Sequence, residues 1–187
     1  MSILRNYTNE KHRAAEATPF VQYMLHGNIT ADDYAVFLQQ MELVYRNIEY
    51  FAEISHLLHD LPDIKRADYM REDLRELGYN VTEEPLPSIK KWCERIVYLY
   101  YTDKSQILAH VYVRHMGDMY GGKIIAKKVP GSGKCYGFED RPALIKALDA
   151  KLSTDIVDEA LVAFDLAIEF FNELQEKLND RGSSNGS

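Results

Sequence analysis

Residues 109–123 read Ala109-His110-Val111-Tyr112-Val113-Arg114-His115-Met116-Gly117-Asp118-Met119-Tyr120-Gly121-Gly122-Lys123. Three glycines and a lone acid interrupt an apolar run that otherwise has helical character. A glycine in a helix interior is destabilising by roughly 1 kcal/mol relative to alanine. Three within six residues therefore predict a place where side chains would obstruct something. We expect the backbone here to approach a flat ligand closely.

The composition favours one globular domain. The chain has 187 residues, and 46% of them are hydrophobic, which can fill one sizeable core. Its net charge of −7 disfavours a nucleic-acid partner, which requires a basic face. Neither a secretory signal nor an apolar run long enough for a membrane span occurs, and the only cysteines are Cys93 and Cys135. We expect a cytoplasmic monomer with reduced thiols.

Apolar residues recur with a period of 3.6, and capping residues punctuate them. Predicted helices cover about 3–17, a short helix opened by Thr18-Pro19, and then 30–51, 63–77, 88–99, 105–128, 141–151 and 154–178. Predicted caps are Thr30, Ser88 and either Ser153 or Thr154, and Gly78 is expected to end a helix. Without βαβ alternation, the expected fold is all-α. The domain would span 1–180, with a flexible tail over 181–187.

His12 has a neighbourhood unlike that of the other five histidines, for which structural roles suffice. Glu16 follows it by four residues on the same helical face, where a carboxylate can orient a metal-ligating imidazole. The same spacing also arises as an ordinary surface hydrogen bond. The pair alone leaves both interpretations open.

The segment Glu10-Lys11-His12-Arg13-Ala14-Ala15-Glu16, together with residues 109–123, resembles the heme oxygenases that produce biliverdin, in order and in separation. The resemblance extends over about residues 3–178. Further matches are Glu42-Leu43-Val44-Tyr45, Glu72-Asp73-Leu74, and Ala163-Phe164 with Phe170-Phe171-Asn172-Glu173-Leu174. It implies a single-domain multi-helix fold in which heme lies between a proximal helix and a distal helix kinked at its glycines.

The resemblance also implies a reaction. Heme b would be both cofactor and substrate, cleaved with O2 and electrons at a meso carbon, for which we expect the alpha position. Biliverdin, CO and free iron would be the products. Reduced ferredoxin is the expected electron donor, because no C-terminal membrane anchor is present. A downstream bilin reductase or a role in iron release would follow, and both remain open.

The family pattern transfers onto named residues of this chain. His12 is the implied axial ligand of heme iron, with Glu16 beside it. Gly117, Gly121 and Gly122 would let the distal backbone approach the macrocycle, and Asp118 would hold a water in a proton network completed by Tyr45 and Arg114. Remaining implied heme contacts are Arg5, Tyr112, Lys146, Phe164 and Phe171, with the alignment around Lys146 ambiguous by about one residue. A basic docking patch for the donor, or a merely solvated cluster, is formed by Lys11, Arg13, Lys123, Lys127 and Lys128.

The chain departs from the family pattern at several positions: Asn9, Val113, His115, Tyr120, Lys123 and Ala167. Tyr120 matters most, because a bulky ring beside the glycines could tighten the pocket or extend the polar network. Two other functions compete. A heme carrier with His12 as its ligand would share the fold, although Asp118 argues against it. A di-iron oxidase is suggested by Glu53-x-x-His56, but no second such motif occurs.

Overall fold

The computed structural model describes residues 2–80 and 84–184, and no strand occurs in those ranges. The all-α prediction is therefore confirmed. The α-helices, with their bounds, are α1 (Arg5–Glu16), α2 (Pro19–Leu25), α3 (Ala31–Ile54), α4 (Ala67–Glu76), α5 (Pro87–Thr102), α6 (Ile107–Val111), α7 (Gly117–Ile125), α8 (Arg141–Asp149) and α9 (Val157–Ser184).

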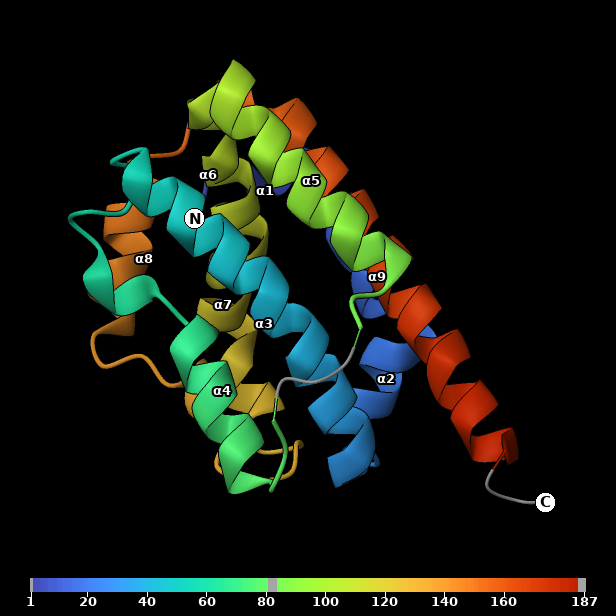
Figure 1. Cartoon of the computed structure of the whole chain (residues 1–187). Coiled ribbons are helices and arrows are strands. Elements are labelled where there is room, and N and C mark those ends of the chain that lie inside the picture. Colours follow the sequence, from blue (N-terminus) through green and yellow to red (C-terminus); the bar gives the residue numbers. More distant parts are fainter. Residues whose placement is uncertain (1, 81–83, 185–187) are drawn as a thin grey trace.

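Helix α3 runs through the middle of the molecule, and the other long helices surround it (Figure 1). It contacts α4, α5 and α6, while α9 contacts α1, α2, α5 and α6. Apolar side chains such as Phe37, Met41 and Ile48 are buried along its length, as expected of a helix enclosed by others. The predicted N-cap is confirmed, since the amide of Asp33 donates to Thr30 Oγ1 over 3.1 Å.

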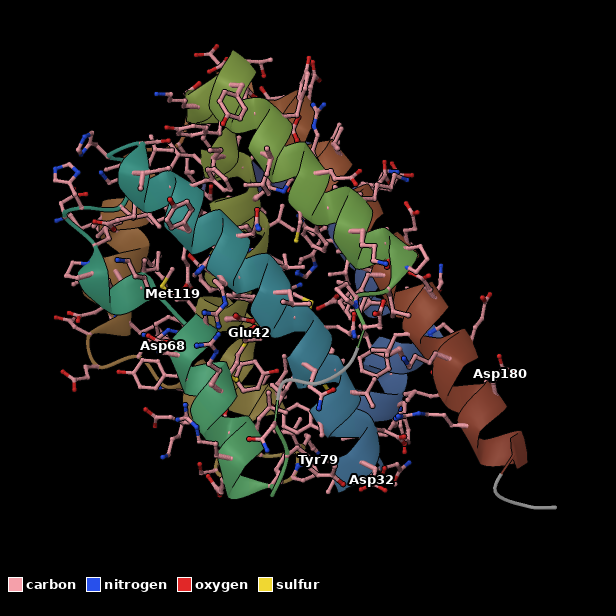
Figure 2. The ribbon with its side chains drawn as sticks, in the orientation of Figure 1. Asp32, Glu42, Asp68, Tyr79, Met119 and Asp180 are labelled. Atoms are coloured by element: carbon pink, nitrogen blue, oxygen red, sulfur yellow. The ribbon has the colours of Figure 1, made fainter. Side chains whose placement is uncertain are left out.

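Two buried carboxylates, one on α3 and one on α4, join neighbouring segments of the fold. Glu42 on α3 has no exposed surface and pairs with Arg46 and with Arg71 of α4, whose Nε lies 2.7 Å from its Oε1. Figure 2 shows Glu42 where α3 and α4 meet. Asp73 of α4 accepts hydrogen bonds from the amides of Lys134 and Cys135, at 2.8 and 2.9 Å. The residues Glu42 and Asp73, singled out by resemblance, therefore anchor the fold.

Three helix boundaries differ from the predictions. The helix predicted from residue 63 begins only at Ala67, after a 3-10 turn (η1, Pro62–Ile64), because the carboxylate of Glu49 captures the amides of Arg66 and Ala67. Ser88 does not cap α5, which begins at Pro87; its amide donates to Glu173 Oε2 instead.

At the C-terminus, α9 continues to Ser184, past the predicted start of the tail at 181, because extending a formed helix is easier than starting one. Residues 185–187 lie outside the described residues. Within the described part of the chain, no helix is both long and apolar enough to cross a bilayer.

The segment predicted as one helix over 105–128 is divided. A 3-10 turn (η2, Lys104–Gln106) and α6 lead into a π-helical turn (η3, Tyr112–Met116), and α7 follows at once. π-turns are rare and occur frequently at functional sites. Here the turn changes the direction in which successive side chains point, immediately before Gly117 and Asp118.

A buried polar chain fixes the start of this segment. Trp92 Nε1 donates to His110 Nδ1 over 2.9 Å, so His110 is neutral, with its hydrogen on Nε2. That nitrogen lies 2.8 Å from Glu159 Oε1, which Arg95 also binds. The chain joins α5, α6 and α9 without a charged imidazole.

The burial of His110 predicts a pH dependence of stability. Burial lowers the pKa of His110 below its usual 6.5, against the opposing hydrogen bond to Glu159. Below pH 6.5 the unfolded chain therefore protonates this histidine more readily than the folded chain does. The free energy of unfolding falls as the pH drops through this range. In His110→Gln, which keeps an amide donor for Glu159, we expect a shallower fall between pH 6.5 and about pH 5 in urea titrations. Equal slopes in both proteins would contradict this.

Candidate active site

A cavity of about 200 Å3 lies between α1, the η3–α7 segment and α9. It is lined by Ser2, Arg5, Thr8, Asn9, His12, Tyr112, Val113, Met116, Gly117, Tyr120 and Phe164. The lining is mainly apolar with a few polar groups, as in small-molecule sites. Its volume is below the usual range of about 300 to 1,000 Å3.

His12 stands on the α1 wall of this cavity. Its side chain is half exposed, and Nδ1 lies 3.5 Å from Glu16 Oε2, longer than an ordinary hydrogen bond. The ring meets Phe164 of α9 edge to face, with centroids 6.1 Å apart. An accessible imidazole with a carboxylate on its far side suits an iron ligand. Glu16 itself does not line the cavity.

Gly117 faces His12's cavity from the distal side. A Cβ built at Gly117 would meet no atom within 4 Å, so open space lies directly above this backbone. The residue is helical, and no turn geometry demands a glycine there. Open space between an imidazole and a bare helix backbone fits a flat macrocycle such as heme. Tyr112 closes the same wall, with its hydroxyl 3.0 Å from Thr8 Oγ1 of α1.

The other two glycines have different surroundings. Gly121 has only the Ile125 side chain nearby, at 3.9 Å from an added Cβ, and it does not line the cavity. Gly122 packs against Tyr136, where an added Cβ would lie 3.0 Å from the Tyr136 Cβ. The structure thus gives Gly122 a packing role, and its contact with a ligand stays a prediction.

Alanine substitutions separate these roles. In Gly122→Ala the new methyl group forces Tyr136 to shift, and we expect a loss of about 1–3 kcal/mol in the free energy of unfolding. Gly121→Ala is the matched control; it should gain about 0.5–1 kcal/mol, because alanine is the better helix former. Urea unfolding of the two variants measures both. Equal effects would remove the packing explanation.

Behind the distal wall, three predicted residues come together. The Tyr45 phenol of α3 donates to Asp118 Oδ2, and Arg114 places its Cζ 5.5 Å from the Tyr45 ring centroid. Burial raises the pKa of Asp118 above its usual value, although Arg114 and the Tyr45 hydrogen bond oppose the shift. Burial also raises the pKa of Tyr45 well above its usual range. A carboxyl that keeps its proton more readily can serve as a donor.

Sequence reasoning missed a second buried pair beside this network. His115 Nε2 lies 3.0 Å from Glu49 Oε1, and the His115 ring lies 4.8 Å from the Tyr45 ring, centroid to centroid. The only signal available was that a histidine stands at 115, where the family pattern has a tyrosine. No local pattern pointed to Glu49, because 66 residues separate the pair.

Other predicted residues lie at the rim or elsewhere. Arg5 and Tyr120 line the cavity, and Tyr120, on α7, is 57% exposed. Phe171 is buried against Phe20, with ring centroids 6.0 Å apart, because it lies two turns beyond Phe164 on α9. Lys146 is exposed on α8, and neither Lys146 nor Phe171 lines the cavity.

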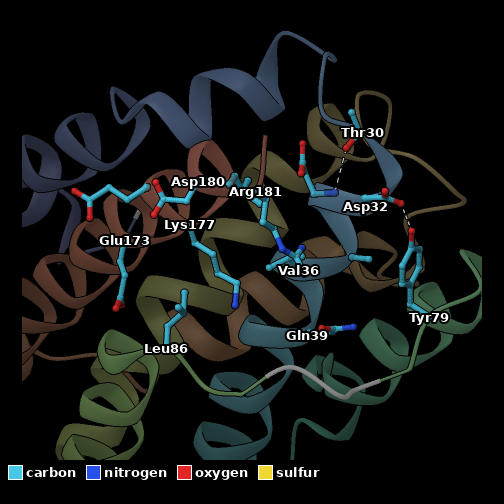
Figure 3. Close-up of a pocket in the computed structure, with 14 residues that line it drawn as sticks. Thr30, Asp32, Val36, Gln39, Tyr79, Leu86, Glu173, Lys177, Asp180 and Arg181 are labelled. Atoms are coloured by element: carbon cyan, nitrogen blue, oxygen red, sulfur yellow. Dashed lines mark hydrogen bonds between the residues drawn. The ribbon is translucent and has the colours of Figure 1, made fainter. Parts of the chain in front are cut away.

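A larger hollow, of about 1040 Å3, lies between the start of α3 and the end of α9 (Figure 3). Its lining is strongly charged and includes Asp32, Glu173, Lys177 and Arg181. Tyr79 donates a hydrogen bond to Asp32 across one end of it. No predicted site residue lines this hollow, and the smaller apolar cavity remains the candidate site.

The di-iron alternative receives no support from the part of the chain that the structure describes. Among those residues, no group of three His, Cys, Asp or Glu side chains could hold a metal ion. Glu53 pairs with Lys65 at 2.9 Å, and His56 is an exposed residue with a positive φ of 59°. Neither residue is part of a metal site among the described residues.

Comparison with known proteins points in one direction. A family model described as heme oxygenase matches residues 1–141. The chain is 28% identical to heme oxygenase 2 of Macaca fascicularis, covering 93% of this chain and 65% of that protein. It thus spans less than two thirds of the macaque relative. It is also 28% identical to a heme oxygenase of the alga Guillardia theta, covering 92% of this chain and 84% of the algal protein.

Solved structures agree with the fold. Heme oxygenase from Leptospira interrogans superimposes with a TM-score of 0.79 at 27% identity, covering 92% of this chain and all of that one. A heme complex of heme oxygenase-1 from the cyanobacterium Synechocystis gives a TM-score of 0.80 at 21% identity, covering 98% of this chain and 97% of that one. The second similarity concerns the fold alone.

Proposed function

Since the chain belongs to the heme oxygenase family, we propose that it cleaves heme at a meso carbon, releasing biliverdin, CO and iron. One observation carries the proposal: the accessible imidazole of His12 and the bare backbone of Gly117 line the same apolar cavity. Bound heme supplies both the iron that activates O2 and the porphyrin ring that is opened. Everything else must come from the protein and an electron donor.

The protein's own part begins with binding. His12 would hold the iron, because its ring is half exposed on the cavity wall and its Nδ1 side is covered by Glu16. Phe164 supports the ring from α9. Arg5 and the Tyr112 hydroxyl are the polar groups of the lining that could meet carboxylates at the edge of the macrocycle. Their positions would fix the rotation of heme in its plane, and we expect cleavage at the alpha carbon.

The distal side would control space and protons. Gly117 has no side chain, so its backbone would face bound heme directly and would leave little room above it. Asp118 and the Tyr45 hydroxyl hold a proton behind this wall, with Arg114 alongside. Because burial raises the pKa of Asp118, its carboxyl takes up a proton more readily than an exposed carboxyl does, and it can pass that proton on through a water.

Electrons would come from reduced ferredoxin. Lys123, Lys127 and Lys128 are exposed on α7 and just after it, and Arg13 is exposed on α1. Lys11 is paired with Asp165 of α9 and is less available. These basic groups suit an acidic protein donor even though the chain is acidic overall.

The thiols of Cys93 and Cys135 are free, which supports a location in the cytoplasm.

The test is a single-turnover assay. Purified protein is mixed with hemin, and reduced ferredoxin is added in air while the Soret band is followed. We expect the Soret band to decay as a bilin spectrum appears, with CO released in equal amount. A Soret band that survives reduction in air would contradict cleavage and indicate a heme carrier.

The donor is tested separately. A chemical reductant replaces ferredoxin in a parallel reaction, and ferredoxin is titrated at increasing salt. We expect turnover with ferredoxin to fall as salt screens the basic side chains, while the chemically driven reaction stays constant. Turnover that ignores salt would contradict electrostatic docking without affecting heme cleavage.

A further inference from the structure

The buried pair of Glu49 and His115 has no part in the function proposed so far. The two side chains are 8% and 0% exposed, and their nearest atoms are 3.0 Å apart. They lie directly beside the Tyr45 ring, on the side of α3 that faces η3. Burying an acid and a histidine in contact lowers the stability of the fold unless both side chains have hydrogen-bond partners.

Glu49 is held firmly by the backbone. Its Oε1 accepts from the amide of Arg66 at 2.5 Å and from the amide of Ala67 at 3.3 Å, and Ala67 begins α4. The carboxylate therefore caps a helix N-terminus from a neighbouring helix, where negative charge is favourable. Glu49 cannot turn away without exposing these amides.

This fixed carboxylate determines how His115 is oriented. A carboxylate only accepts hydrogen bonds, so His115 Nε2 carries the hydrogen. The other ring nitrogen, Nδ1, is buried and has no hydrogen-bond partner among the described residues. The ring is therefore held from its Nε2 side alone, and losing Glu49 would leave it without a polar restraint.

The His115 ring in turn contacts Tyr45, which donates the hydrogen bond to Asp118. The His115 ring lies 4.8 Å from the Tyr45 ring at a tilt of 53°, and Arg114 lies over that ring as well. The Tyr45 phenol is thus confined on two sides while it donates to Asp118. Small rotations of the phenol would break that hydrogen bond, so the packing of the ring decides whether it persists.

We propose that His115 is a positioning residue for the distal proton network: held by Glu49 through Nε2, its ring keeps the Tyr45 phenol aimed at Asp118. The inference rests on the proposed function for its purpose, but its geometry is present without heme.

Heme-free protein provides the decisive measurement. With tyrosine labelled at 13Cζ, the Tyr45 resonance is assigned by its loss in Tyr45→Phe, and its displacement in Asp118→Asn marks a disturbed hydrogen bond. In His115→Phe, which keeps the ring and loses both nitrogens, we expect Tyr45 to move in the same direction. In His115→Gln, whose amide nitrogen reaches the place of Nε2 but which has no ring, the Tyr45 resonance should also move, because the hydrogen bond to Glu49 alone does not confine the phenol. His115→Asn, which reaches only the place of Nδ1, should behave like phenylalanine.

His110→Phe is the matched control, because it also breaks a buried histidine–glutamate pair, whose acid lies on α9 and not on α3. It should lower stability without moving the Tyr45 resonance. In the heme complex, His115→Phe should keep its affinity for hemin while turnover falls by about 10- to 100-fold, as when an outer partner of an active-site group is lost. His115→Gln should not restore turnover, because it keeps a donor for Glu49 and supplies no ring against Tyr45.

Two outcomes would overturn the positioning role. One is a Tyr45 resonance that does not move in His115→Phe or His115→Asn; the other is an equal displacement in His110→Phe. Because the resonance needs no heme, a parent protein that failed to cleave heme would contradict only the proposed function. The two failures are therefore distinguishable.

Discussion

Replacing His12 with alanine is expected to abolish the axial bond to heme iron and nearly all heme cleavage. The cavity would keep its apolar lining and its arginine, so hemin should still bind, but with a spectrum that lacks the imidazole ligand. Removing an outer partner of a ligating histidine costs roughly 10- to 100-fold, and removing the ligand itself should cost more. Optical and electron paramagnetic resonance spectra of the ferric complex would show the change of ligand, and the single-turnover assay the loss of bilin.

Added imidazole is a sharp control for His12→Ala, because the histidine side chain is half exposed and a free ring can take its place. Imidazole should restore the parent spectrum and part of the turnover. His26→Ala removes a histidine that caps α2, outside the cavity, and should change neither spectrum nor turnover. An unaltered bilin yield in His12→Ala would show that His12 is not the ligand.

Replacing Asp118 with alanine should leave heme binding intact and lower the bilin yield by about 100- to 10,000-fold, the range for loss of a positioned proton donor. Hemin would still meet His12 and Gly117, but the Tyr45 phenol would have no acceptor. Hemin titration measures the affinity, and the yield of bilin per heme measures the loss. Full bilin yield in this variant would remove Asp118 from the mechanism.

The conservative variant Asp118→Asn separates function from folding. Because burial raises the pKa of Asp118 in the folded protein, ionising it at neutral pH destabilises the fold. This loss of stability is complete at pH values above the raised pKa that Asp118 has in the folded chain. It vanishes below pH 3.8, the pKa of Asp118 in the unfolded chain, because both states are then protonated. We therefore expect the asparagine variant to be more stable than the parent at pH 7 and to lose this advantage toward acid pH. Urea titrations across pH would show whether the two curves converge.

Local patterns were sufficient for the framework of the fold. The helix over Ala31–Ile54 has a capping threonine and apolar residues on the 3.6 period, and both are present in the structure. The pairing of His12 with the glycine segment came from the family resemblance, and the structure places His12 and Gly117 in the lining of one cavity. Periodicity and capping act within a few residues along the chain, and this is why a single sequence reveals them.

Contacts between distant residues were beyond those patterns. Lys65 and Arg66 are ordinary helix formers, and only Glu49, seventeen residues from Arg66, moves the start of α4. The packing role of Gly122 depends on Tyr136, which lies fourteen residues away and cannot be linked to it by a local pattern. Tyr112–Met116 contains no glycine or proline, so no local signal in the sequence predicted a π-turn.

That π-turn sets the angular relation between two short helices. Each residue advances an α-helix by about 100°, and a π-turn accommodates an additional residue before the α-helical course resumes. Consequently, α6 can present His110 to the core while α7, a few residues on, presents Gly117 to the cavity. Shortening the segment by one residue would rotate everything after it and turn a binding wall toward the protein interior. The number of residues between His110 and Gly117 is therefore as much a determinant of the cavity as their identity.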